Sequence, residues 1–158
     1  MARELIDLMQ RIRRAVHSER AMRVALTTLL SVHKPRIFEQ GIDADRQKIG
    51  TYSTKPISIS RKQQARDTGK TRFPGGYAQY KAEIGKGGPV NLRNTDQMMA
   101  DYQIIQDGER FGFGFQNSEN FNKSQWLQDK YEKNIFDVSD NELDILGDTH
   151  KSEVEKLI

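Results

Sequence analysis

The clearest signal for the fold is MMADYQIIQDGERFGFGFQ, residues 98–116. Both of its halves alternate between two kinds of residue, and an alternation with a period of two is typical of a β-strand with one buried face. Between the halves lies Asp107-Gly108, a pair that favours a two-residue hairpin turn with positive φ. In the second half every other residue is phenylalanine and the intervening ones are glycine, so the glycine face is open to close approach. We predict an antiparallel β-hairpin over 99–116 at the centre of the sheet.

Helices are expected before this hairpin. Residues 3–40 should form a helical pair or one bent helix, with Pro35 kinking or restarting it near Lys34 and Gly41 ending it. The first part carries one apolar stripe at helical spacing, made of Leu5, Leu8, Met9, Ile12 and Val16.

Helices are expected after the hairpin as well. Residues 120–134 have helical spacing, and Ser139 with Glu142 forms a capping-box pattern that starts a helix at Asp140. Gly147 should end that helix, and a last short helix should follow within 147–158. The predicted class is α+β: an antiparallel sheet centred on the hairpin and packed by N-terminal and C-terminal helices. One domain would span 1–146, and 147–158 would be a tail or short helix.

The middle of the chain has a different composition. Residues 41–97 contain 8 of the 12 glycines and 3 of the 4 prolines, which predicts a long loop over about 50–89 with a short helix near 77–84. Plain disorder is poor in aromatic residues, so we expect this loop to order on a partner or in an assembly. Its aromatic residues are the candidates for contacts between subunits: Tyr52, Phe73, Tyr77 and Tyr80.

Composition and charge limit the class of protein. Only 35% of the 158 residues are apolar, which predicts a small core, and the absence of cysteine excludes disulfides, thiolate metal sites and cysteine nucleophiles. No apolar run approaches the roughly 18 residues of a membrane span, and we expect no secretion signal. Residues 1–72 carry 16 basic and 7 acidic residues (+9), whereas residues 73–158 carry 9 and 15 (−6). Such a division favours head-to-tail self-assembly, or alternatively a nucleic-acid face.

Motifs for chemistry are few, and we predict no catalytic residue, cofactor or metal. Gly69-Lys70-Thr71 is the tail of a phosphate-binding loop, but Gln64 stands where the motif needs glycine. Asp43 and Asp45 could bind a metal, as in a small nuclease, although two acids beside Gly41 are more often a solvated turn.

The densest basic run is the candidate DNA-facing segment. Lys and Arg on a glycine-flanked loop can follow phosphates without reading sequence. Its members are Arg61, Lys62, Arg66, Lys70 and Arg72.

The order of several short motifs resembles one protein family. These motifs are IFEQGID at 37–43, GTYS at 50–53, VNLRNTDQM at 90–98, and KY at 130–131 followed by IFDVS at 135–139. Over residues 1–146 this order resembles the virion morphogenesis and tail completion proteins of tailed bacteriophages, small structural proteins of the neck. Asp96 stands where glycine is usual in that family, so a different turn is expected there.

The resemblance implies an α+β subunit without catalytic activity or cofactor. It implies a six- or twelve-fold homo-oligomeric ring in the virion that contacts portal, adaptor or tail-tube proteins and passes double-stranded DNA through its lumen. The alternative is a non-sequence-specific nucleic-acid-binding protein that uses the basic run.

Overall fold

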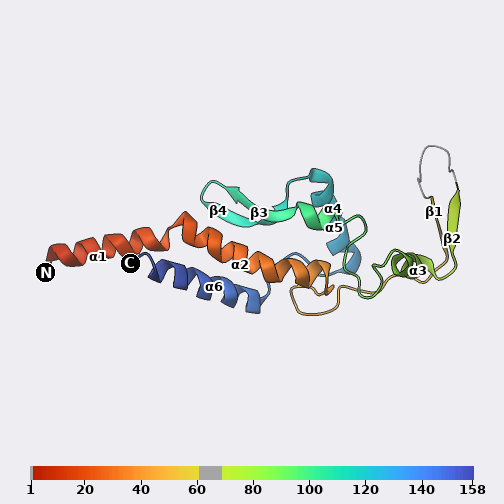
Figure 1. Cartoon of the computed structure of the whole chain (residues 1–158), viewed down its shortest axis with the longest axis horizontal. Helices are drawn as coiled ribbons and strands as arrows, with labels where there is room; N and C mark the ends of the chain where they lie inside the picture. The colour runs from red at the N-terminus through yellow and green to blue at the C-terminus, as the bar shows by residue number, and fades with distance from the viewer. Residues whose placement is uncertain (1, 61–68) are drawn as a thin grey trace.

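Two helices in sequence form the spine of the molecule. In the computed structural model, which describes residues 2–60 and 69–158, α1 (Ala2–Val16) and α2 (Glu19–Phe38) follow one another as the predicted helical pair. Ser18 breaks the pair and caps α2, because its side-chain oxygen accepts a hydrogen bond from the Ala21 backbone N–H at 3.4 Å. Figure 1 shows α1 as an extension of an elongated molecule, with most other elements arranged along or beyond α2.

The C-terminal end of α2 is only partly as predicted. The helix continues through Pro35 to Phe38, so no new helix starts near Lys34. Pro35 lies in the last turn, and its carbonyl accepts the N–H groups of the next residues outside the helix. The chain then turns at Gly41 with a φ of +66°, the left-handed conformation expected after a helix.

Helix α6 (Asp140–Glu155) lies antiparallel beside α2 (Figure 1). It begins at the predicted capping box, in which Ser139 and Glu142 each satisfy a backbone N–H of the other. The predicted stop at Gly147 is wrong, and there is no separate last helix. Gly147 is exposed with open space around it, and the helix runs on because Val154 further along is buried against Ala15 of α1. The predicted boundary at 146/147 therefore lies inside one continuous helix.

The predicted hairpin is present and lies along α2 on the other side from α6 (Figure 1). A short helix, α4 (Gln97–Asp101), leads into β3 (Tyr102–Asp107), which pairs antiparallel with β4 (Arg110–Phe115). Asp107 pairs with Arg110, so the two turn residues are Gly108 and Glu109, one position later than predicted. Gly108 has a φ of +60°.

The two faces of this hairpin have different neighbours. Tyr102 and Phe113 lie on the face toward α2, where Phe113 stacks on His33 with ring centroids 5.1 Å apart. On the opposite face, the side chain of Ile105 covers Gly114, where a Cβ would lie only 2.4 Å from its terminal methyl carbon. The close approach expected at the glycines is thus made within the hairpin at Gly114, and Gly112 remains open.

The predicted loop over 50–89 contains more regular structure than expected. Strands β1 (Ile57–Ser60) and β2 (Lys70–Phe73) form a second antiparallel hairpin, followed by α3 (Gly76–Glu83) near the predicted 77–84 helix. These elements lie at the opposite end of the molecule from α1 (Figure 1). Each of the two hairpins is a separate sheet of two strands. The hairpin of β3 and β4 is therefore not the centre of a larger sheet, contrary to what the sequence predicts.

The main core lies where the ends of α2, β3 and α5 (Ser118–Tyr131) meet, at the site of the predicted 120–134 helix. Its buried members are Ile37, Phe38, Ile49, Val90, Met98, Tyr102 and Ile135. This small core, two hairpins and flanking helices confirm the α+β class.

Candidate functional site

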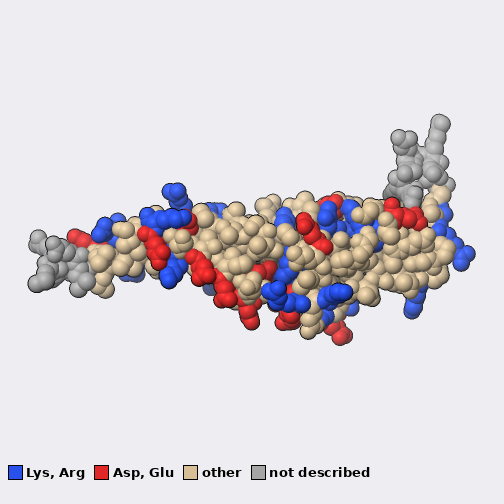
Figure 2. All heavy atoms as spheres, turned by 60° about the horizontal axis from the view of Figure 1, so that its bottom comes forward, with Lys and Arg blue, Asp and Glu red and all other residues tan. Residues whose placement is uncertain are grey.

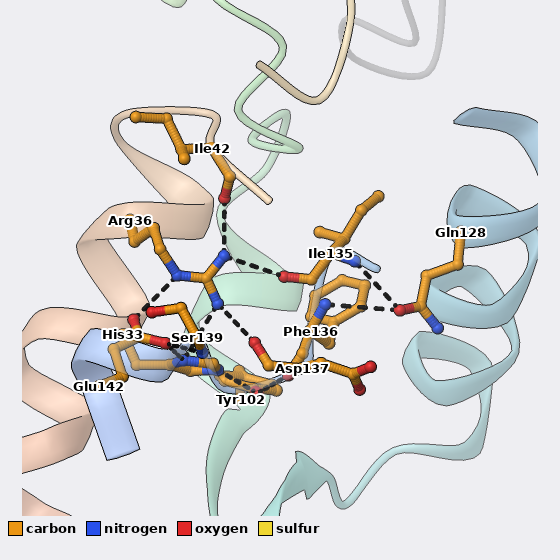
Figure 3. Close-up of polar contacts among 10 residues, drawn as sticks. All are labelled: His33, Arg36, Ile42, Tyr102, Gln128, Ile135, Phe136, Asp137, Ser139 and Glu142. Atoms are coloured by element: carbon orange, nitrogen blue, oxygen red, sulfur yellow. Dashed lines mark hydrogen bonds and ion pairs between the residues drawn. The ribbon is translucent and has the colours of Figure 1, made fainter. Parts of the chain in front are cut away.

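A cluster of buried polar side chains has the composition of a catalytic site. We call it the His33 cluster: His33 and Arg36 from α2, Tyr102 from β3, and Ser139 with Glu142 at the start of α6 (Figure 3). The two ring nitrogens of His33 lie 3.0 Å from Glu142 Oε2 and 2.8 Å from Tyr102 Oη. The Arg36 Nε–H donates to Glu142 Oε1 at 2.8 Å. The backbone N–H of Ser139 donates to Glu142 Oε2 at 2.9 Å.

Arg36 extends this cluster to the chain segments around it. Its two terminal nitrogens donate to the carbonyl oxygens of Ile42 at 2.9 Å and Asp137 at 2.7 Å (Figure 3). The guanidinium therefore joins the end of α2, the turn after it, the 135–139 segment and α6. A planar group with five N–H donors suits this bridging role.

The electrostatics of the cluster keep Glu142 ionised. Burial opposes its charge, but the hydrogen bonds from His33, Arg36 and the Ser139 N–H outweigh that effect and lower the Glu142 pKa to about 2. Burial raises the pKa of Tyr102, so its hydroxyl remains protonated. The buried charge of Glu142 is thus matched by the buried charge of Arg36.

The burial of the cluster assigns it a structural role. His33 is 0% exposed, Tyr102 1% and Glu142 4%, so a substrate has no access to the polar atoms. The geometry fits a polar core that fixes α2, α6 and the 102–115 hairpin relative to one another. Sequence reasoning found no acid partner for a histidine, because Glu142 lies 109 residues from His33 in the chain.

Only part of the basic run lies in the described residues. Lys70 and Arg72 are exposed on β2, two positions apart and so on one face of its hairpin. Arg61, Lys62 and Arg66 lie outside the described residues. The DNA-facing role of the run stays a prediction.

The four aromatic candidates lie together. Tyr52 and Tyr77 have ring centroids 5.5 Å apart, and the same distance separates Tyr77 from Tyr80. Tyr80 contacts Phe73 at 5.4 Å, and Phe73 is 1% exposed. These contacts pack α3 against the strands and loop beside it, and the three tyrosines are partly exposed. A contact of these residues with a neighbouring subunit stays a prediction.

The two weak motifs also have defined places. Asp43 is 0% exposed and is not a solvated turn residue: its Oδ1 accepts the Gln47 N–H at 2.7 Å, and its Oδ2 forms an ion pair with Lys133 at 3.2 Å. No group of three potential metal ligands occurs within residues 2–60 and 69–158. Lys70-Thr71 lies on a strand of the second hairpin rather than at a helix N-terminus, where a phosphate cradle requires it.

Uncovered apolar surface is concentrated on α1. Five apolar residues of α1 are between 37% and 61% exposed: Ile6, Leu8, Met9, Ile12 and Val16. The last four belong to the predicted stripe, which the described part of the chain therefore leaves largely uncovered. Across the described part of the chain, no helix is both long and apolar enough to span a membrane.

Opposite charges occupy different elements. Arg11, Arg13 and Arg14 are exposed on α1, whereas Asp144 and Asp148 are exposed on α6. Figure 2 shows acidic side chains following one another along the α6 side of the molecule.

Searches against protein-family models, curated proteins and solved structures found no match for this chain.

Proposed function

We propose that this chain is a structural protein of the tailed-bacteriophage neck. Copies form a homo-oligomeric ring, six- or twelve-fold, which joins the portal or adaptor to the tail and lets the DNA pass through its lumen. The protein acts in the virion by matching one ring to the next and catalyses no reaction.

The observation that carries this proposal is the uncovered stripe on α1. An isolated 15-residue helix is marginal in water, and most helical stability in proteins comes from packing of an apolar face. The members of the stripe whose burial the structure describes are all more than a third exposed: Leu8, Met9, Ile12 and Val16. A helix that is apolar on one face and uncovered fits a subunit that is completed by its neighbours.

Charge and shape support the same assembly. The basic helix α1 projects from one end of the molecule and the acidic face of α6 runs along its side, so neighbouring copies can meet head to tail. Heterologous contacts of this kind close into a ring when the rotation between copies permits.

The direct test is made in a phage that carries this gene. Without the protein we expect DNA-filled heads and separate tails, and joined particles when the wild-type protein is supplied from a plasmid. Infectious, joined particles formed in its absence would refute the proposal.

A paired variant tests the role of α1 in the same assay. Met9→Glu with Ile12→Glu places charge on the stripe and should prevent rescue while the isolated subunit melts at the same temperature. Phe121→Glu, on a 51% exposed residue of α5, is the matched control for adding charge at an exposed apolar position outside the proposed contact surfaces.

The second candidate function is non-sequence-specific nucleic-acid binding through the basic run. It is supported by the exposure of Lys70 and Arg72 on one face of a projecting hairpin. It predicts that the isolated monomer binds duplex DNA with an affinity that falls steeply with salt. Charge reversal at Arg61, Lys62 and Arg66 should abolish that binding. The same changes test a role of the basic run in the lumen: if assembled particles that carry them hold and eject DNA normally, that role is excluded.

A further inference from the structure

A pocket of about 330 Å³ lies between α3, the 90–94 segment and α5. Aromatic rings form much of its wall: Tyr52, Tyr77, Trp126 and Tyr131. Trp126 is 57% exposed. This volume lies at the lower end of the range for small-ligand sites, and apolar walls with a few polar groups are typical of them.

Lys81 is the charged group of this pocket that is buried, whereas Arg93 and Lys130 are not. Lys81 is 1% exposed, and the contact of its ammonium within the described chain is the face of Tyr52, with Nζ 5.2 Å from the ring centroid. No hydrogen bond or ion pair of that ammonium occurs among residues 2–60 and 69–158. Burial lowers the Lys81 pKa, and the nearby charge of Lys86 lowers it further, while the charge of Asp96 offsets part of this effect. A buried charge without a counter-ion is costly, so an anion in the pocket would relieve that cost.

The surroundings of Lys81 have an excess of positive charge. Arg93 and Lys130 also line the pocket, and no carboxylate does. The nearby carboxylate of Asp96 is already bound, because it accepts from Arg93 Nε at 2.7 Å and Lys86 Nζ at 2.8 Å. The Nζ of Lys130 lies 4.7 Å from the centroid of the Trp126 ring, and Lys130 forms no ion pair with a carboxylate among the described residues.

We propose that this pocket binds a carboxylate carried on an apolar body, with Lys81 as its anchor. The ammonium pairs with the carboxylate, and the rings of Tyr52, Tyr77 and Trp126 contact the apolar body. A carboxylate suits the site better than a phosphate, because phosphate sites use several convergent donors and the Arg93 guanidinium is already engaged by Asp96. The group can belong to a free organic acid or to an acidic side chain of a polypeptide. This site goes beyond the proposed neck function and does not depend on it.

The full chain reports on the site directly, because Trp126 is its single tryptophan. The probes are 3-phenylpropionate, its uncharged amide, inorganic phosphate and a capped tripeptide with a glutamate between two leucines, all at constant ionic strength. Probes of this size bind with dissociation constants on the order of millimolar, so titrations should reach tens of millimolar. We expect 3-phenylpropionate to change the Trp126 fluorescence saturably and the amide not to do so.

Lys81→Met should weaken binding of 3-phenylpropionate by about 10-fold or more, the loss of one charge-assisted hydrogen bond. Lys151→Met, which removes the same charge from an exposed position on α6, should leave the affinity unchanged. Tighter binding of the tripeptide assigns the site to a polypeptide, and binding of the free acid alone assigns it to a small molecule. Equal binding of acid and amide, unchanged affinity in Lys81→Met, tighter binding of phosphate, or no binding of either carboxylate probe would each overturn the proposal.

Discussion

Glu142→Gln tests whether the His33 cluster holds the fold together through charge. The substitution keeps the size of the side chain but leaves Arg36 buried without its counter-charge. The Glu142 pKa falls from 4.5 to about 2 on folding, and this shift corresponds to about 3 kcal/mol of stability at pH 7. The independent expectation for removing one partner of a buried ion pair is also about 3–5 kcal/mol. We therefore expect a loss of about 3 kcal/mol in the free energy of unfolding.

The sign of the pH dependence follows from the lowered pKa. The stability that Glu142 contributes is fully present above its unfolded pKa of 4.5 and is lost as the pH falls toward its folded pKa of about 2. Urea denaturation of both proteins should therefore show a difference of about 3 kcal/mol at pH 7 and about half of that at pH 3. Asp144→Asn, on an exposed acid of the same helix, is the control and should change stability by about 0.5 kcal/mol or less. Equal stability of Glu142→Gln and wild type at pH 7, or a difference that does not change with pH, would refute this account.

Three further substitutions test other parts of the fold. Gly147→Ala should raise the free energy of unfolding by about 0.5–1 kcal/mol, because alanine favours a helix and the space around this helical position is open. Gly76→Ala should lower it by about 2 kcal/mol or more, since the φ of Gly76 is +72° and a Cβ would lie 2.5 Å from backbone carbonyl oxygens. Thermal denaturation of the two variants checks the opposite signs of these changes in stability. Without added ligand, Lys81→Met should stabilise the protein by about 1 kcal/mol at pH 7, because it removes a buried charge. Burial lowers the folded-state pKa of Lys81 below 10.5, so the difference in stability from wild type should narrow as the pH rises through that lowered pKa toward 10.5, the value of the unfolded chain. A less stable variant at pH 7 would contradict this. Val154→Ala should lower the free energy of unfolding by about 1–2 kcal/mol. It should also speed hydrogen exchange of the α1 amides more than exchange of the 102–115 hairpin amides, because Val154 packs where α1 meets α6. Equal acceleration in both elements would contradict this local role and would mean that Val154 stabilises the whole fold.

Several elements could be predicted because their signals are local. The alternation in 99–116 and the Asp107-Gly108 pair identified one hairpin, and the Ser139–Glu142 spacing identified the start of α6. The second hairpin was missed although Ile57 to Ser60 alternate, because its partner strand Lys70–Phe73 is polar and has no strand signal of its own. The stop at Gly147 failed because burial of Val154, seven residues later, outweighs the modest cost of one glycine in a helix.

The turn at Asp96 shows how tertiary contacts can stabilise a locally unfavourable residue. Asp96 has a φ of +61°, a left-handed conformation that favours glycine, and it lies at the start of α4. Asparagine and aspartate tolerate this region better than most residues. Here the carboxylate is also held by Arg93 and Lys86, whose hydrogen bonds lower its pKa. At this position the backbone therefore adopts a conformation that glycine prefers, although the residue is aspartate.

Local sequence patterns predicted most of the helices, one of the two hairpins, the amphipathic character of α1 and the opposite charges of the two halves. Periodicity, caps and turn residues act over a few positions, so they can be read without knowing the fold. Packing between distant segments brought Glu142 to His33 across 109 residues, buried Lys81 in an aromatic pocket and left the α1 stripe largely uncovered. Burial and ion pairing depend on which distant segments pack together, and that outcome is set by the free energy of the whole chain rather than by any one segment.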